Sequence, residues 1–181
     1  MQVPEAIRHM SKFIKEIARD NFMMIELGTW VGYSASIWGK ELKRYENAKV
    51  LCIDNMYMPE EMHNSPYHKG QSKAMKRNKM VPLLLRNIKA LGLEGVVFLA
   101  KIPFEKMSDY LKEKSIDFLY IDLGYNYEEQ VDAFKRYLPL VKKGGWVGGD
   151  DYDDGHPYRV RAITEFLGEV KTGERFWYKQ I

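Results

Sequence analysis

Cysteine, net charge and long apolar runs are all scarce in this sequence. Cys52 is its only cysteine, which excludes an internal disulfide and a cysteine-rich zinc site and suits a reducing cytosol. The formal charge of +3 is too small to indicate a nucleic-acid partner. No apolar run approaches the length of a membrane span, and residues 5–20 carry charges throughout, where a signal peptide has an apolar core. We therefore expect a cytoplasmic protein that contacts neither a membrane nor nucleic acid.

The composition is that of a soluble globular protein. Hydrophobic residues make up 45% and charged residues 29% of the sequence, which argues against a disordered or fibrous chain. A length of 181 residues suits one ordinary domain with a sizeable core. Because we find no repeat, low-complexity stretch or linker, we expect residues 1–181 to form a single domain.

Short apolar runs alternate with segments whose apolar residues recur at helical spacing. The expected strands are 22–27, 50–53, 96–100, 116–121, 146–149 and 175–180. The expected helices lie near 4–17, 35–45, 82–91, 103–114, 131–141 and 160–170, with Gly144 and Gly145 closing the fifth helix. Continuous apolar strands between amphipathic helices are typical of a mostly parallel sheet covered on both faces. The sequence thus predicts an α/β fold.

Acidic residues stand where the expected strands end. Glu26, Asp54, Asp122, Asp150 and Asp151 occupy the carboxyl ends of four different strands. Ligands of open parallel sheets bind beyond these ends. We therefore expect five carboxylates along one rim of the sheet, beside a ligand.

A glycine-containing segment joins the first strand to the first helix that follows it. It runs Glu-Leu-Gly-Thr-Trp-Val-Gly-Tyr-Ser from Glu26 to Ser34, and Gly28 and Gly32 would let the backbone approach a ligand closely. The spacing is not that of the dinucleotide fingerprint, which makes an NAD-dependent oxidoreductase a distant alternative. Glu26 disfavours a pyrophosphate and suits an ammonium group, whereas Asp54 can accept hydrogen bonds from ribose hydroxyls. Alternatively, either glycine alone serves only a tight turn.

This segment, with an acid after the second strand, resembles the cofactor motifs of class I S-adenosylmethionine-dependent methyltransferases. It is especially similar to the catechol, caffeoyl-CoA and macrocin-type O-methyltransferases. The resemblance covers most of the chain and implies a Rossmann-like class I methyltransferase fold. By this likeness, the methionine part lies by the glycine loop, the ribose by Asp54 and the adenine near Ile102. The cofactor-binding residues that it implies are Glu26, Gly28, Thr29, Trp30, Gly32, Ser34, Asp54, Asn55, Ile102 and Asp122.

Three acids at the ends of the fourth and fifth strands form a candidate metal site. Without an internal cation, Asp122, Asp150 and Asp151 would raise one another's pKa values. Mg²⁺ or another hard divalent cation would remove that penalty and would lower the pKa of a substrate hydroxyl. The resembled metal-dependent enzymes carry one aspartate and an acidic pair at these positions. Alternatively, the acids cap helices or face solvent, or Asp153 and Asp154 are the ligands.

The sequence departs from the resembled enzymes where their general base stands. Tyr125 occupies the position of a lysine in the catechol type, and Gly124 that of an acid in the macrocin type. The candidate catalytic residues are therefore Asp122, Tyr125 and His156. Tyr125 is a poor base at neutral pH unless a metal perturbs it, and a surface role is the simpler interpretation of His156.

The leading functional prediction is a metal-dependent O-methyltransferase acting on a small hydroxylated molecule, such as a sugar or a phenol. Residues 56–71 lack a clear period and are predicted to form a loop that closes over the substrate as a lid. A metal-free methyltransferase acting on another atom and a non-catalytic cofactor-binding protein stay open as alternatives. The first helix and the C-terminal strand are candidates for pairing in a homodimer.

Overall fold

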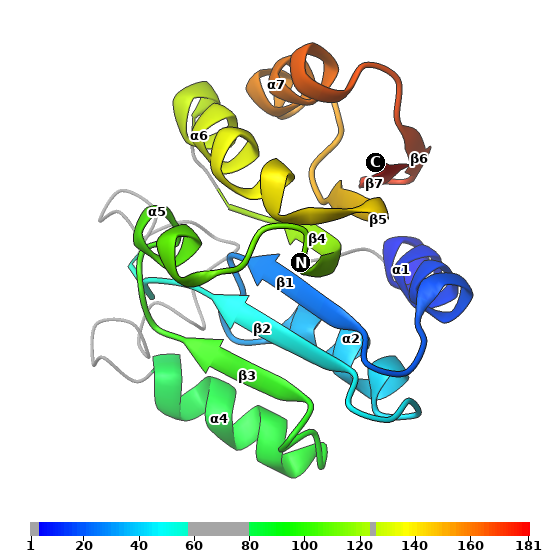
Figure 1. Ribbon diagram of the computed structural model, residues 1–181, viewed down its shortest axis with the longest axis vertical. Helices are drawn as coiled ribbons and strands as arrows, with labels where there is room; N and C mark the ends of the chain where they lie inside the picture. The colour runs from blue at the N-terminus through cyan, green and yellow to red at the C-terminus, as the bar shows by residue number, and fades with distance from the viewer. Residues whose placement is uncertain (1–3, 58–79, 124–125) are drawn as a thin grey trace.

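The computed structural model describes residues 4–57, 80–123 and 126–181 and contains one seven-stranded sheet (Figure 1). Its strand order is β3-β2-β1-β4-β5-β7-β6. The strands are β1 Met23–Leu27, β2 Lys49–Ile53, β3 Val97–Ala100, β4 Ile116–Ile121, β5 Val141–Gly149, β6 Lys171–Gly173 and β7 Phe176–Gln180. Strands β1 to β5 pair in parallel, whereas β7 pairs antiparallel with both β5 and β6. This mostly parallel sheet confirms the predicted Rossmann-like fold class.

Helices cover both faces of the sheet (Figure 1). One face carries α1 Pro4–Ile17, α2 Tyr33–Leu42 and α4 Met80–Ala90, and the other carries α5 Phe104–Met107, α6 Tyr127–Tyr137 and α7 Pro157–Leu167. Short 3-10 turns at Ser108–Tyr110 and Leu138–Leu140 follow α5 and α6. Among the helices of the described segments, none is long and apolar enough to cross a membrane.

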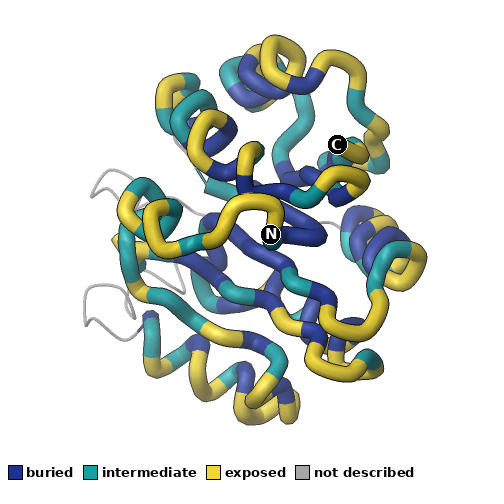
Figure 2. Tube along the Cα trace, in the orientation of Figure 1, coloured by how far each residue is buried: buried dark blue, intermediate teal, exposed yellow. Residues whose placement is uncertain are grey.

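The strands separate two apolar cores because successive side chains point to opposite faces. Met24 of β1 packs into the core beneath α1, α2 and α4, and its neighbour Ile25 packs into the core beneath α5, α6 and α7. Phe118 and Leu119 of β4 divide in the same way. Figure 2 shows the resulting buried centre between exposed helix surfaces. Burial on both faces explains why these strands read as continuous apolar runs.

Several element boundaries differ from the sequence-based expectation, and three of the differences have a clear physical reason. The helix expected at 103–114 is only α5 and a 3-10 turn, because Leu111 is already extended and the chain turns back toward β4. Gly144 and Gly145 do not close a helix but lie inside β5, which begins at Val141. Pro139 explains the early end of α6, since proline cannot continue the helical hydrogen bonding.

The remaining differences lie in the C-terminal hairpin and in the predicted lid. Strand β6 was not expected, because Lys-Thr-Gly is too short and too polar to show a strand pattern. It forms a hairpin with β7 that extends the sheet beyond β5. Of the predicted lid at 56–71, residues 58–71 lie outside the described residues.

Candidate functional site

The loop between β1 and α2 lies directly against the end of β4. Gly28 has a φ of 82°, and a Cβ atom there would overlap the carbonyl oxygen of Asp122. Gly32 has the same φ of 82° at the N-terminus of α2. Both positions therefore require glycine for conformation, and Gly28 also requires it for space. The tight turn and the ligand-facing loop, which were alternatives in the sequence, are thus compatible features of one segment.

Asp54, at the end of β2, holds this loop in place. One of its carboxylate oxygens accepts hydrogen bonds from the backbone N–H groups of Thr29, at 3.0 Å, and Trp30, at 2.9 Å. The other oxygen accepts from the Met56 N–H group at 2.6 Å. A carboxylate has about four acceptor positions, so one remains for a ligand hydroxyl in this arrangement. The predicted ribose acid is therefore also a structural anchor of the loop.

Glu26 lies beneath the loop and has no contact with solvent. Its carboxylate accepts hydrogen bonds from the Ser34 hydroxyl of α2 and from the Cys52 thiol, the latter at a sulfur–oxygen distance of 3.6 Å. Burial raises the pKa of Glu26 to about 8, although the Ser34 hydrogen bond opposes this. A buried carboxyl of this kind is mostly protonated at neutral pH and would ionise if a cation came close to it.

Three of the other predicted cofactor residues follow the strands β1, β2 and β3. Trp30 is half-buried with a positive φ of 53°, a conformation that non-glycine residues seldom adopt. Asn55 is exposed after β2 and accepts a hydrogen bond from the Tyr57 N–H group at 2.8 Å. Ile102 follows β3 and packs at the edge of the core beneath α5 and α6. The predicted set therefore spans the carboxyl ends of β1, β2 and β3.

The acidic end of the rim contains two arginines that the sequence interpretation missed. Arg159, in the first turn of α7, lies 3.6 Å from Asp122 and 3.3 Å from Asp151, measured between side-chain nitrogen and oxygen atoms. Arg175, in the turn between β6 and β7, contacts Asp151 and lies 3.9 Å from an oxygen of Asp150. Two arginine side chains therefore already supply positive charge to the three acids.

A signal for these arginines was present but weak. Arg159 comes three residues after His156, where the first turn of a helix beginning at Pro157 returns toward the sheet. Arg175 precedes the final strand at the turn of a hairpin that the sequence did not reveal. Clustered buried carboxylates require counter-charges, so the acids themselves were the reason to search for basic partners.

Charges from both sides set the ionisation of Asp122. Partial burial and the neighbouring Asp150 raise the pKa of Asp122 to about 6, while Arg159 and Arg175 act in the opposite direction. Asp150 is buried, and Asp151 adopts a positive φ of 62°. Residues held in such sparsely populated conformations are typical of functional sites.

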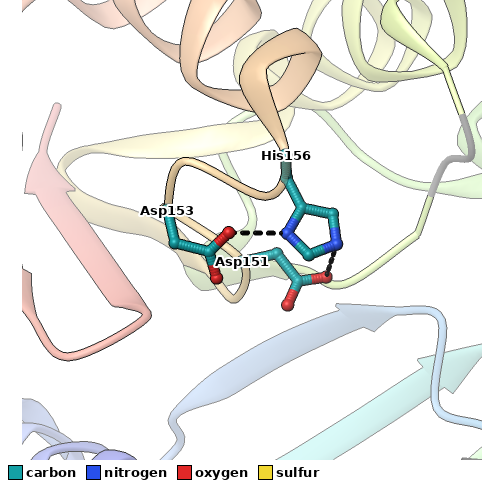
Figure 3. Close-up of side chains that lie close together, drawn as sticks. All are labelled: Asp151, Asp153 and His156. Atoms are coloured by element: carbon teal, nitrogen blue, oxygen red, sulfur yellow. Dashed lines mark hydrogen bonds and ion pairs between the residues drawn. The ribbon is translucent and has the colours of Figure 1, made fainter.

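His156 stands between two carboxylates of the loop that follows β5 (Figure 3). Its Nδ1 atom lies 2.8 Å from an oxygen of Asp153, and its Nε2 atom lies 3.6 Å from an oxygen of Asp151. The side chain of His156 is 32% exposed, so it is partly at the surface while it contacts both carboxylates. The third catalytic candidate, Tyr125, lies outside the described residues together with Gly124.

The donor set of the acidic rim fits a divalent cation. Asp122, Asp150, Asp151 and Asp153 offer four carboxylates against the two guanidinium groups of Arg159 and Arg175, so two negative charges remain unbalanced. Oxygen donors with excess negative charge are the environment that hard divalent ions prefer. Among the described residues, three side chains offer possible metal-ligand atoms that lie within 4.8 Å of one another: Asp151, Asp153 and His156.

Comparisons with known proteins agree with this arrangement. Residues 25–152 match a family model described as a methyltransferase domain. The uncharacterised protein R132 of Acanthamoeba polyphaga mimivirus is 25% identical over 171 residues, covering 89% of this chain and 66% of that protein. The chain thus spans just under two thirds of the length of this relative.

Solved structures of O-methyltransferases share the fold. An O-methyltransferase from Bacillus cereus in complex with SAH superposes with a TM-score of 0.63 at 14% identity, covering 98% of this chain and 80% of that one. The O-methyltransferase NovP gives a TM-score of 0.64 at 21% identity, covering 97% of this chain and 78% of that one. Since the family model matches most of the chain, including the glycine loop and the acidic rim, this protein belongs to the methyltransferase-domain family and is a class I S-adenosylmethionine-dependent methyltransferase.

Proposed function

We propose that this methyltransferase transfers the methyl group to a hydroxyl of a small molecule, such as a sugar or a phenol, with the help of a divalent cation. One observation carries the proposal: the glycine loop that would hold the methyl donor packs against Asp122, the first acid of the charged rim. The donor site and the carboxylate cluster are therefore contiguous. The O-methyltransferases of similar fold support the choice of oxygen as the acceptor atom.

In this proposal the two ends of the rim have separate tasks. Glu26 would pair with the ammonium group of the methyl donor, and Asp54 would accept a hydrogen bond from its ribose while fixing the loop through Thr29 and Trp30. A divalent cation bound by the acids would lower the pKa of a substrate hydroxyl that it contacts. Asp122, Asp150 and Asp151 are the predicted oxygen donors.

Two arginines influence the charge that a substrate oxygen would meet beside the acids. Arg159 is buried and already pairs with Asp122 and Asp151, so it offsets part of the negative charge that a substrate oxyanion would meet in the same cluster. Arg175 is 33% exposed and contacts Asp151 in the same cluster. Because the two guanidinium groups leave two negative charges of the cluster unbalanced, an acidic hydroxyl would bind there most readily together with a divalent cation.

Release of S-adenosylhomocysteine from S-adenosylmethionine, measured with panels of phenols and sugars, tests this function. We expect turnover with a hydroxylated acceptor that falls at least tenfold after chelation with EDTA and recovers on addition of Mg²⁺ or Mn²⁺. Asp150→Asn should show the same loss. Asp109→Asn, which changes an exposed acid of the 3-10 turn after α5, is the matched control and should retain activity.

The arginines also favour a second candidate function, which is methyl transfer without a metal. Arg159 and Arg175 already supply two positive charges to the acids, so the cluster is stable enough to fold without a bound cation. This candidate predicts turnover that is insensitive to EDTA, and methylation of amines when they are added to the acceptor panel. Absence of turnover with tight binding of S-adenosylhomocysteine would instead indicate a non-catalytic binding protein.

A further inference from the structure

The peptide unit between Val31 and Gly32, in the second half of the glycine loop, is held at both ends. Its N–H group, on Gly32, donates to the carbonyl of Thr29 at 2.8 Å. Its carbonyl, on Val31, accepts from the side-chain amide of Asn87 in α4 at 3.1 Å. Because a glycine adopts either sign of φ at little steric cost, the φ of 82° at Gly32 does not by itself fix this unit. The hydrogen bonds at its two ends therefore set its orientation.

Helix α4 reaches the loop with two residues that lie one turn apart. Leu84 is fully buried and packs against Gly32, where a Cβ atom would lie 3.3 Å from Cγ of Leu84. Asn87 follows three residues later on the same side of the helix. The apolar core already fixes the position of α4 through Leu84 and Ile88. The half-buried Asn87 thus adds a directional contact with the loop to a helix that does not need this residue for its place.

We propose that Asn87 is a positioning residue for the methyl donor, which acts by holding the Val31 carbonyl and with it the binding conformation of the glycine loop. Asp54 holds the first half of the loop through the N–H groups of Thr29 and Trp30. Asn87 holds the second half from α4. The inference rests on the donor site of the proposed function and extends it to a residue outside the predicted cofactor-binding set.

The loop needs an anchor on each half because its backbone is strained. Trp30 has a φ of 53°, and a non-glycine residue keeps such a conformation only where its surroundings determine it strongly. Asp54 binds the N–H group of Trp30 itself, and Asn87 binds the carbonyl of the next residue. Without the second anchor the loop populates further conformations. A donor that binds only one of them then loses affinity in proportion to the population of that conformation.

The surroundings of Asn87 allow this role to be separated from a role in folding. Asn87 lines a surface groove of about 450 Å³, whose other lining residues include Val31, Tyr33 and Lys40. A side chain of similar size can therefore replace Asn87 without overlapping its neighbours. Loss of one ordinary hydrogen bond changes an equilibrium constant by about two- to tenfold, so we expect folded variants whose loop is less well held.

Titration calorimetry with S-adenosylhomocysteine and hydrogen–deuterium exchange of the loop amides test the inference on the full chain. Asn87→Asp keeps the shape of the side chain but cannot donate to the Val31 carbonyl at pH 7.5, and Asn87→Leu removes the donor without adding charge. Both should bind S-adenosylhomocysteine about three- to tenfold more weakly, with faster exchange at residues 28–32. Asn87→Gln, which retains the amide donor, should bind within twofold of the wild type.

Asn47→Asp is the matched control. It makes the same chemical change at an exposed amide, which donates to Asn21 at 3.3 Å in the turn before β2 and is not part of the glycine loop. This variant should bind S-adenosylhomocysteine like the wild type. Urea denaturation of every variant reports stability separately from affinity.

The outcomes distinguish the anchor from a structural contact and from the proposed function. Wild-type affinity in both Asn87→Asp and Asn87→Leu overturns the inference, and a loss of stability with unchanged affinity does so by showing a purely structural hydrogen bond. Asn87→Gln binding as weakly as Asn87→Asp also contradicts it, because the amide donor would then be irrelevant. If the folded wild type binds no S-adenosylhomocysteine, the donor site and this inference fall together, whereas equal binding by all variants overturns the inference alone.

Discussion

Replacement of Glu26 by glutamine should abolish a proton exchange that accompanies cofactor binding. Glu26 is fully buried and bonded to Ser34 and Cys52, and burial raises its pKa to about 8 from an ordinary value of 4.5. At pH 7 the wild-type carboxyl is therefore mostly protonated. Pairing with the ammonium group of S-adenosylhomocysteine requires the ionised form, so binding should release close to one proton per chain.

The same pKa makes the free protein less stable as the pH rises. A folded-state pKa that lies above the unfolded value gives stability that is fully present below pH 4.5 and is lost as the pH rises through about 8. Each pH unit between these values corresponds to about 1.4 kcal/mol. Between pH 5 and pH 8, Glu26 should thus lower the free energy of unfolding of the wild type by about 3–4 kcal/mol relative to Glu26→Gln.

Binding should have the opposite pH dependence from stability. Because the ionised fraction of Glu26 rises about tenfold from pH 6 to pH 7, the affinity for S-adenosylhomocysteine should rise about tenfold over the same interval. Glu26→Gln removes the titrating group, so its weaker affinity should be nearly independent of pH.

Calorimetric titration in buffers of different ionisation enthalpy measures the proton release, and urea denaturation at several pH values measures the stability. Wild-type binding that releases no proton at pH 7, or a Glu26→Gln variant that keeps the full pH dependence, would refute the assignment of the ammonium group to Glu26.

Two further substitutions test the supports of the site, and a third tests the opposite end of the sheet. Gly28→Ala should lower the free energy of unfolding by about 2–4 kcal/mol, measured by urea denaturation, because the residue has a positive φ and no room for a Cβ atom. Asp54→Ala should weaken S-adenosylhomocysteine binding at least tenfold in calorimetry, since two loop amides lose their acceptor; unchanged affinity would show that the ribose lies elsewhere. Asp117→Asn should lower the free energy of unfolding by about 2 kcal/mol, seen as a lower thermal midpoint, because the buried carboxylate of Asp117 holds Lys142 at 2.7 Å and the Met23 N–H group at 2.9 Å. An unchanged midpoint would show that these contacts add nothing to stability.

The cofactor end of the site was predictable because its signals are contiguous. Gly28 and Gly32 stand six and two residues before Ser34 in one segment, and Asp54 ends the next strand, so local pattern and parallel topology suffice to bring them together. The hydrogen bonds from the loop amides to Asp54 were beyond the sequence, because they depend on the path of the backbone between Gly28 and Gly32.

The acidic end was predictable only in part. Asp122 and Asp150 follow two apolar strands that are adjacent in the sheet, so their position on the rim follows from topology. Arg175 reaches the same place only through the β6–β7 hairpin, and the short polar β6 has no pattern that distinguishes it from a loop. Val141 shows a related limit: its spacing continues that of α6, but Pro139 ends the helix and Val141 begins β5.

Titration of S-adenosylhomocysteine into the wild-type protein at pH 7.5, with and without Mn²⁺, tests the central claim most directly. The account predicts one molecule bound per chain at the rim formed by Glu26, Asp54 and the glycine loop, together with a higher thermal midpoint of the complex. It further predicts tighter binding of S-adenosylhomocysteine when Mn²⁺ is present, since the bound cation relieves the repulsion among the rim acids that Arg159 and Arg175 leave unbalanced. A folded protein that gives neither binding heat nor a shift of the thermal midpoint would contradict it.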